Sequence, residues 1–154
     1  MNVFIGADHG GFSLKQEIKA WLVSDSRFKI TDCGATENDP QDDYPVYALA
    51  VARQVAADPT SLGILTCRSG GGMAVVANKI KKIRAVEVFD VKSATHARIH
   101  DHANIMTLGS DWWSFSQVRP WIEAFLTTPV EVNERRLRRL QEISQIENNI
   151  NSNS

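Results

Sequence analysis

Short apolar runs alternate with helical patterns five times along this chain. Strands and helices in such alternation are joined by right-handed crossovers, which produce a parallel sheet covered by helices on both faces. We therefore predict an α/β fold, a doubly wound three-layer sandwich of Rossmann-like type with a five-stranded parallel sheet and an additional C-terminal helix. The predicted strands are residues 3–5, 28–33, 62–66, 84–89 and 105–108, and the predicted helices are residues 14–22, 44–57, 73–80, 91–101, 114–126 and 131–148.

The size of the chain fits one such sandwich. Its 154 residues, 43% of them hydrophobic and 23% charged, are enough for a single domain with its own core. No internal repeat or linker divides residues 1–147, so we predict one domain over that range. Ser13 is predicted to cap the first helix, and the Asn- and Ser-rich residues 148–154 are predicted to form a disordered tail.

Charge and cysteine content exclude several classes of protein. The 17 Lys and Arg residues are balanced by 18 Asp and Glu, so we expect no nucleic-acid partner. The apolar runs are far shorter than the roughly 20 residues that span a bilayer, and the first residues lack the basic segment of a signal peptide. Cys33 and Cys67 are too few for a disulfide framework or a four-ligand zinc site. We therefore expect a cytoplasmic protein with reduced thiols and no membrane association.

Residues 67–72 join a predicted buried strand to a predicted helix and contain three consecutive glycines. Gly70, Gly71 and Gly72 let the backbone approach a ligand closely, and successive amides before a helix form a cradle for an anion. The same surroundings favour the thiolate form of Cys67. The segment matches neither the Walker phosphate loop nor the dinucleotide motif, which belongs after the first strand. A structural glycine turn beside a buried cysteine is the alternative.

Asp8 and His9 follow the first predicted strand. Ligands of parallel sheets bind beyond the carboxyl ends of the strands, which is where this pair lies. A carboxylate beside an imidazole can bind sugar hydroxyls or phosphate, or transfer protons. The alternative is a capping aspartate next to an incidental surface histidine.

Histidines and arginines recur at helical spacing in the second half of the chain. His96 and His100 share a helix face, but no HExxH motif surrounds them, so we predict no metal and prefer one histidine acting as an acid or base. Arg135 and Arg139 also share a face, as a phosphate clamp requires. A solvated basic stripe paired with neighbouring glutamates is the alternative for these arginines.

Taken together, these segments resemble the B-type ribose-5-phosphate isomerases, a family that includes the galactose-6-phosphate isomerase subunits. The resemblance implies a doubly wound α/β sandwich that forms a homodimer, or a tetramer, with its active site at the subunit interface. It also implies cofactor-free interconversion of ribose 5-phosphate and ribulose 5-phosphate. The matching segments are 6–12, 43–45, 67–72, 77–80, 83–86, 93–94 and 109–110, together with Arg98, His100, Asn104, Arg135 and Arg139.

The resemblance further implies a role for each site residue. Cys67 lies where one branch of the family has its catalytic base, whereas another branch uses a Glu at the position of Met73, and Met cannot transfer a proton. Cys67 is thus expected to move a proton between C2 and C1 through an enediolate, with Ser69 near the reacting carbons. His100 and Asp8 are expected to help open the furanose ring. The implied binding residues are His9, Arg135 and Arg139 at the phosphate, Tyr44 in the pocket, and Arg68, Gly70, Gly71, Gly72 and Asp101.

Three positions depart from the family pattern. Arg68 replaces a usual Gly, Asp101 stands where Asn is usual, and Asp111 stands where many members have a phosphate-binding Arg. Two acids near an anionic substrate make isomerisation of allose 6-phosphate, galactose 6-phosphate or a tetrose phosphate the main alternative, with Arg68 offsetting one acid. A non-catalytic sugar-phosphate-binding module is a second alternative. A thiol redox protein is a third, although the chain has no CxxC motif.

Overall fold

The computed structural model describes residues 1–152, with side chains described up to residue 149. Within this range one parallel sheet is built from β1 (Asn2–Ala7), β2 (Lys29–Asp32), β3 (Leu62–Cys67), β4 (Ala85–Glu87) and β5 (Ile105–Gly109). The strand order is β2-β1-β3-β5-β4, and every neighbouring pair is parallel. The central strand β3 is buried along its whole length, as its apolar sequence requires. The predicted five-stranded parallel sheet is confirmed.

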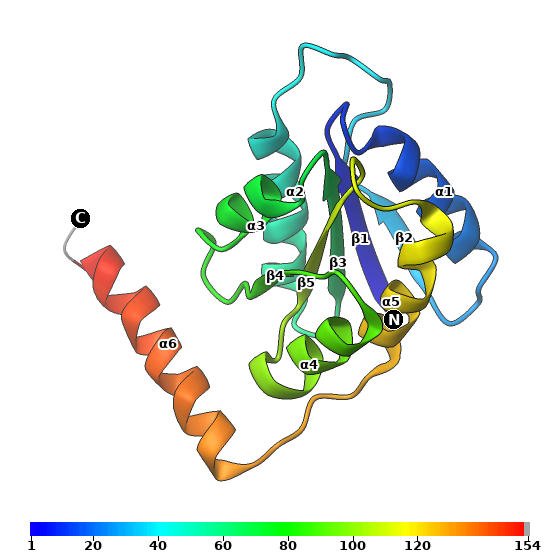
Figure 1. Ribbon diagram of the computed structural model, residues 1–154. Coiled ribbons are helices and arrows are strands. Elements are labelled where there is room, and N and C mark those ends of the chain that lie inside the picture. Colours follow the sequence, from blue (N-terminus) through cyan, green and yellow to red (C-terminus); the bar gives the residue numbers. More distant parts are fainter. Residues whose placement is uncertain (153–154) are drawn as a thin grey trace.

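Helices cover both faces of the sheet, so the molecule has three layers (Figure 1). One face carries α1 (Phe12–Val23), α4 (Val91–Asp101) and α5 (Phe115–Thr127), and the other carries α2 (Tyr44–Ala57) and α3 (Gly71–Ala77). Each face has its own apolar core. Ile18 and Phe125 belong to the first, and Val51 and Met73 to the second. The doubly wound sandwich predicted from the alternating pattern is therefore confirmed.

The order of the strands places the loops that matter for function. The chain leaves β1 toward one edge of the sheet to form β2, and then returns to form β3 on the other side of β1. In sheets of this kind, ligands bind at such a reversal, beyond the carboxyl ends of the strands. The loops that follow β1 and β3 lie at the upper edge of the sheet in Figure 1. They contain residues 8–11 and 68–70, which the sequence singled out.

The first helix begins earlier than predicted. Ser13 is not its cap, because α1 starts at Phe12 and the Lys15 amide already donates to the Gly11 carbonyl oxygen at 2.9 Å. The reason lies in the loop before it. A Cβ on Gly11 would lie 2.2 Å from the Thr66 carbonyl oxygen, so the backbone passes directly against β3 at this point. Gly11 therefore takes the cap position and Ser13 falls inside the first turn.

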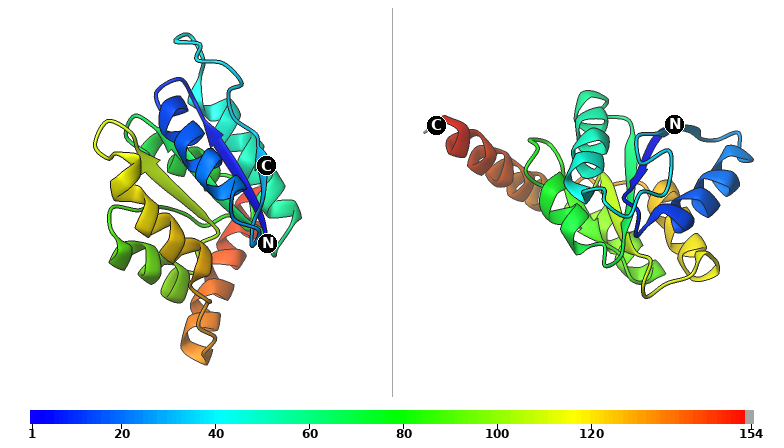
Figure 2. Two further views of the ribbon diagram at one scale, coloured as in Figure 1. Left: turned by 90° about the vertical axis from the view of Figure 1, so that its right-hand side faces the viewer. Right: turned by 90° about the horizontal axis from the view of Figure 1, so that it is seen from above.

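The last helix, α6 (Glu134–Ser152), lies outside the three layers (Figure 1; Figure 2). It begins at Glu134 and not at residue 131, and it continues through residues 148–152, where the sequence suggested a disordered tail. Residues 153 and 154, also assigned to that tail, lie outside the described residues. The predicted domain boundary at residue 147 therefore falls inside α6 and not at its end.

Few parts of the described chain contact α6. It packs against α4, and near its other end the Lys82 amide donates to Glu147 Oε2 at 3.2 Å. Leu137, Ile143 and Ile146 are exposed on it. A helix with apolar side chains in solvent commonly packs on another surface. Among the described residues, no helix is long and apolar enough to cross a membrane.

A buried lysine fastens α1 to the end of β2. Lys15 is fully buried, and its Nζ donates to Asp32 Oδ1 at 2.9 Å and to the Ala35 carbonyl oxygen at 2.5 Å. Lys19 donates to the other carboxylate oxygen of Asp32 at 2.9 Å. Burial acts to raise the pKa of Asp32, but the hydrogen bonds from Lys19 and Lys15 outweigh it and lower that pKa. Lys15 therefore joins two elements across the core.

We expect Lys15→Met to lower the free energy of unfolding by about 3 kcal/mol, because the Asp32 carboxylate loses its buried lysine partner and the Ala35 carbonyl oxygen loses its donor. Lys19→Met is the matched control. Its ammonium binds the same Asp32 but the side chain is 40% exposed, so the expected loss is at most about 1 kcal/mol. Equilibrium urea unfolding measures both. Equal losses in the two variants would contradict a special role for the buried lysine.

Candidate active site

The segment after β3 forms a tight turn around Cys67. Gly70 has a φ of 87°, a conformation that favours glycine, and a Cβ on Gly72 would lie 3.0 Å from the Tyr44 ring. The Gly70 amide donates to Cys67 Sγ at 3.1 Å, and Cys67 is only 5% exposed. An amide that donates to sulfur fixes the position of the Cys67 side chain within the turn. The turn thus holds a potential base against a fixed backbone donor, with Tyr44 packed against one side.

Ser69 lies exposed on the same turn. Its Oγ is 3.9 Å from the position that a Cβ on Gly71 would take, and Glu87 Oε2 is 3.7 Å from that position. A Cβ at Gly71 would therefore make only ordinary van der Waals contacts with the Ser69 hydroxyl and the Glu87 carboxylate.

The loop after β1 places Asp8 and His9 beside this turn. Asp8 is buried, and its Oδ1 accepts the Gly11 amide at 3.0 Å, which closes the loop. His9 Nδ1 lies 2.6 Å from Asp42 Oδ1, and the His9 amide donates to the same oxygen at 3.0 Å. The hydrogen bond with Asp42 raises the pKa of His9 against the opposing effect of burial. His9 therefore carries its positive charge to higher pH than an ordinary histidine.

Asp42 is a site residue that the sequence did not reveal, because nothing marks it within a polar loop and it lies 33 residues from His9. Burial acts to raise its pKa, but the hydrogen bonds from His9 outweigh burial and lower it. Asp8, His9 and Asp42 present side-chain nitrogen and oxygen atoms within 4.8 Å of one another, and the hydrogen bond between His9 and Asp42 already joins two of these atoms.

A second group of predicted site residues lies where α4 and α6 meet. It consists of His100 from α4 and of Arg135 and Arg139 from α6. They line a cavity of about 340 Å³ together with Arg136, a residue that the sequence analysis passed over. Arg136 Nη2 lies 2.8 Å from His100 Nδ1, and the rings of His96 and His100 stack with centroids 4.0 Å apart. Burial, Arg136 and His96 lower the pKa of His100, so its imidazole is neutral near pH 7. A neutral imidazole beside three arginines can accept a proton close to a bound phosphate.

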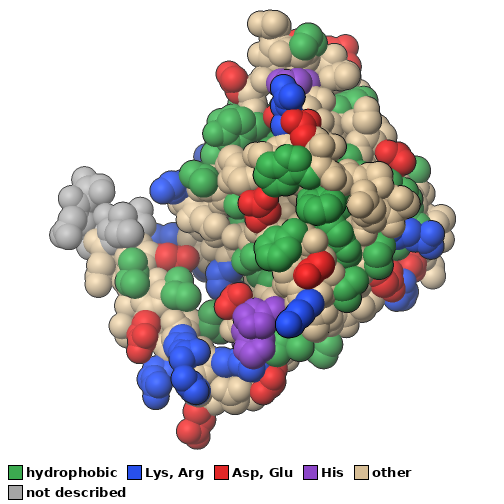
Figure 3. Space-filling model, viewed as in Figure 1, with side chains coloured by type: hydrophobic (Ala, Val, Ile, Leu, Met, Phe, Trp, Pro, Cys, Tyr) green, Lys and Arg blue, Asp and Glu red, His purple; other side chains and the backbone are tan. Residues whose placement is uncertain are grey.

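The two groups lie at opposite edges of the sheet. Helix α4 starts after β4 at the carboxyl edge and ends before β5 at the amino edge, so His100 lies at the amino edge. Cys67 ends β3 at the carboxyl edge. A strand of five residues such as β5 spans about 15 Å, which sets the scale of the separation. In Figure 3 the histidine side chains accordingly appear in two separate places. One chain does not bring His100 to Cys67.

A family model described as Ribose/Galactose Isomerase matches residues 3–143 of this sequence. The chain belongs to this family. The resemblance found in the sequence motifs is thereby confirmed. The ribose-5-phosphate isomerase B of Mycolicibacterium paratuberculosis is 37% identical over 147 residues, which cover 96% of this chain and 92% of that relative.

Solved structures of the ribose/galactose isomerase family match the fold closely. The ribose-5-phosphate isomerase B of Clostridium thermocellum has a TM-score of 0.92 and 31% identity, over 97% of this chain and 99% of that one. The ribose-5-phosphate isomerase B of Mycoplasma genitalium, solved with bound ribulose 5-phosphate, has a TM-score of 0.90 and 36% identity, over 96% of each chain.

Two of the departures from the family pattern contact each other. Arg68 Nε donates to Asp111 Oδ2 at 3.0 Å, and the Asp111 amide donates to the Arg68 carbonyl oxygen at 3.0 Å. Ser110 Oγ donates to the Gly10 carbonyl oxygen at 2.7 Å, so the loops after β1, β3 and β5 are tied together. Both charged side chains are well exposed, so the ion pair adds little stability. Its consequence is local, because Arg68 neutralises the acid that this family member has at position 111.

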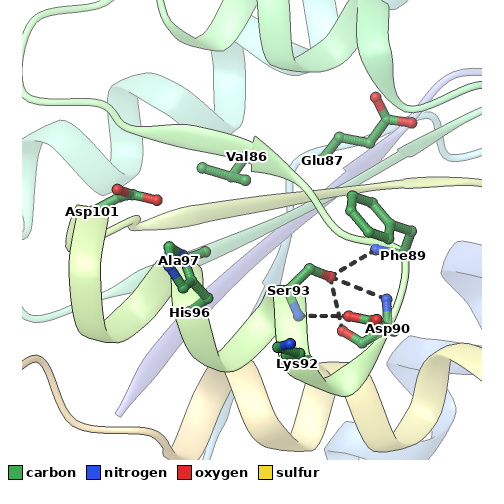
Figure 4. A pocket seen from close by; sticks show the side chains of 9 residues that line it. All are labelled: Val86, Glu87, Phe89, Asp90, Lys92, Ser93, His96, Ala97 and Asp101. Atoms are coloured by element: carbon green, nitrogen blue, oxygen red, sulfur yellow. Dashed lines mark hydrogen bonds between the residues drawn. The ribbon is translucent and has the colours of Figure 1, made fainter.

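The third departure, Asp101, lies elsewhere. A cavity of about 330 Å³ between β4 and α4 is lined by Asp101, His96 and Glu87, among others, and Figure 4 shows Asp101 and Glu87 at opposite ends of it. His100 instead lines the cavity beside α6. Asp101 has no hydrogen-bond or ion-pair partner among the described side chains, although its charge acts to raise the pKa of His100.

Proposed function

We propose that this chain is a cytoplasmic ribose-5-phosphate isomerase that interconverts ribose 5-phosphate and ribulose 5-phosphate without a cofactor. Family membership supports this function, as do relatives named ribose-5-phosphate isomerase B, one of them solved with ribulose 5-phosphate. The observation that carries the proposal is the turn after β3. It holds the Cys67 sulfur against the Gly70 amide, beside the loop that carries Asp8 and His9.

Proton transfer between two carbons is the central step. The Cys67 thiolate takes the proton from C2, and the electron pair left behind forms the C1–C2 double bond of an enediolate. The C1 carbonyl oxygen becomes the oxyanion and takes over the proton of the C2 hydroxyl. The proton held by Cys67 then returns to C1, and the C2 oxygen becomes the new carbonyl. Amides of residues 68–72 and the Ser69 hydroxyl stabilise the developing oxyanion, an effect typically worth about 2.7–4 kcal/mol per donor.

Ring opening and phosphate binding involve the other residues. The neutral His100 imidazole accepts the proton of the C1 hydroxyl and returns it to the ring oxygen as the bond between C1 and that oxygen breaks, and Asp8 contacts a ring hydroxyl during opening. His9, Arg135 and Arg139 bind the phosphate, since a protonated imidazole and two guanidinium groups form charge-assisted hydrogen bonds with it.

These roles can be combined only if two chains build each site. His100, Arg135 and Arg139 lie at the amino edge of the sheet, whereas Cys67 lies at the carboxyl edge. A twofold homodimer brings the amino-edge group of one protomer to the carboxyl-edge group of the other and forms two equal sites. The apolar residues exposed on α6 supply a surface for such an interface. A tetramer of two such dimers preserves the same sites.

Asp101 motivates a second candidate, isomerisation of another sugar phosphate. Asp101 follows His100 in the sequence and its charge acts on that imidazole, although its side chain lines the separate cavity between β4 and α4. Without a hydrogen-bond partner among the described residues, its carboxylate favours a sugar that offers it a hydroxyl. Asp111 no longer supports this alternative strongly, because Arg68 pairs with it.

Purified protein is expected to convert ribose 5-phosphate to ribulose 5-phosphate without added metal, and to prefer it over allose 6-phosphate, galactose 6-phosphate and erythrose 4-phosphate. Ketose formation measured for each sugar phosphate checks this. Higher kcat/KM on one of the other sugars would establish the second candidate. Binding of every sugar phosphate without turnover would instead identify a non-catalytic binding module.

A further inference from the structure

A single buried carboxylate oxygen holds His9 at two points. Asp42 Oδ1 accepts the His9 amide at 3.0 Å and lies 2.6 Å from His9 Nδ1. The Asp42 side chain is 7% exposed, and that of His9 is 32% exposed. No described residue forms a hydrogen bond with His9 Nε2. One edge of the imidazole is therefore fixed, and the other is available to a ligand.

The charge of Asp42 depends on His9. The other carboxylate oxygen, Oδ2, is buried, and besides His9 the carboxylate has the neutral Tyr47 hydroxyl as a hydrogen-bond partner. A buried carboxylate with only neutral partners is costly unless a cation lies beside it. His9 is the group positioned to supply that cation. Asp42 in turn keeps the proton on Nδ1, so a second proton on Nε2 makes this nitrogen a charged donor.

Other charged groups also face His9. Asp8, in the same loop, acts to raise the pKa of His9, as Asp42 does, whereas Arg68, from the loop after β3, acts to lower it. Tyr47, one turn into α2, forms a hydrogen bond with the Asp42 side chain, which acts to lower the pKa of Asp42. The hydrogen bond with Asp42 is the largest of these influences on His9.

We propose that Asp42 is a positioning residue that orients and charges His9, so that Nε2 donates to the phosphate of the sugar substrate. The inference rests on the proposed function and deepens it, because it names the group that prepares the phosphate contact. Asp42 itself does not touch the substrate. It acts through the imidazole, whose orientation and charge it sets.

Asp42→Asn separates charge from position. The amide oxygen of Asn still accepts both His9 hydrogen bonds, but it carries no charge. In ligand-free protein, the pKa of His9 measured by NMR titration is expected to be lower than in wild type, because the charged partner is gone. Inorganic phosphate is expected to bind about tenfold more weakly than to wild type at pH 7.5, where a smaller fraction of the variant's imidazole is charged. At pH 5.5 both proteins carry a charged His9, so the difference is expected to disappear.

Asp42→Ala removes position as well as charge. Phosphate binding is expected to be weaker than in wild type at both pH values, because a charged but freely rotating imidazole loses part of its hydrogen-bond geometry. With ribose 5-phosphate, both variants are expected to raise KM and to leave kcat within about twofold of wild type, since the phosphate contact is remote from the reacting carbons.

Glu37→Gln is the matched control. It removes one negative charge from the same loop, at an exposed side chain for which no hydrogen bond or ion pair is found. His9 titration and phosphate affinity are expected to match wild type. An equal change in Glu37→Gln and Asp42→Asn would overturn the proposal in favour of a general charge effect. An unchanged pKa of His9 in Asp42→Asn, or a loss of phosphate affinity independent of pH, would overturn it as well.

The titration and phosphate measurements need no turnover. If wild type failed to isomerise any sugar phosphate, the proposed function would fall, while the His9 titration would still decide the role of Asp42. If wild type isomerised ribose 5-phosphate and Asp42→Asn bound phosphate normally at pH 7.5, only the role of Asp42 would fall.

Discussion

Cys67→Ala is expected to lower kcat for ribose 5-phosphate by about 10³-fold, within the range of about 10²–10⁴-fold that a positioned proton-transfer group typically supplies. The backbone amides of the turn, Ser69 and the phosphate-binding residues all stay in place. KM is therefore expected to change little. Steady-state kinetics and a direct binding measurement with the same sugar phosphate check the two parts separately.

Cys33→Ala is the control for the loss of a thiol. Burial, together with the Asp32 carboxylate, raises the pKa of the Cys33 thiol, so this residue stays protonated near neutral pH. Its removal is expected to leave kcat close to wild type. Turnover retained in Cys67→Ala would remove Cys67 as the base, and Glu87, whose carboxylate also faces the turn, would become the residue to test.

The fold followed from the sequence because its signals are local. Apolar runs and helical spacing predicted each strand and helix that the structure describes. The order of the strands in the sheet could not be predicted in this way. The position of β5 between β3 and β4 depends on which strands pair with each other, and no short segment of sequence determines that pairing. Gly11 shows the same limit at the scale of one residue, since its contact with Thr66 moved the start of α1.

The site was only partly predictable for the same reason. Asp8, His9, Cys67 and the glycines stand in recognisable motifs directly after strands. Asp42 stands in a polar loop with several other acids, and only the folded chain shows which of them meets His9. The pairing of Arg68 with Asp111 joins residues 43 positions apart. Comparison with the family pattern marked Arg68 and Asp111 as unusual residues. It could not show that their opposite charges pair with each other.

Mixing two inactive variants is expected to restore activity if each site draws on two chains. Cys67→Ala and His100→Ala are each expected to be nearly inactive alone. In a heterodimer, one site combines both substitutions, and the other combines the intact Cys67 of one protomer with the intact His100 of its partner. Random assembly of equal amounts makes half of the dimers heterodimers, so about a quarter of wild-type activity is expected.

The matched control mixes His100→Ala with Arg139→Ala. Both side chains line the same cavity beside α6, so they belong to the same edge of one chain. Each site of that heterodimer then contains one of the two substitutions, and no intact site forms. Activity above the sum of the components in the first mixture, but not in the second, places Cys67 and His100 of each site on different protomers. If neither mixture exceeded the sum of its components, the two-chain site would be wrong. The mixed dimers of Cys67→Ala and His100→Ala would then contain no site that combines an intact Cys67 with an intact His100.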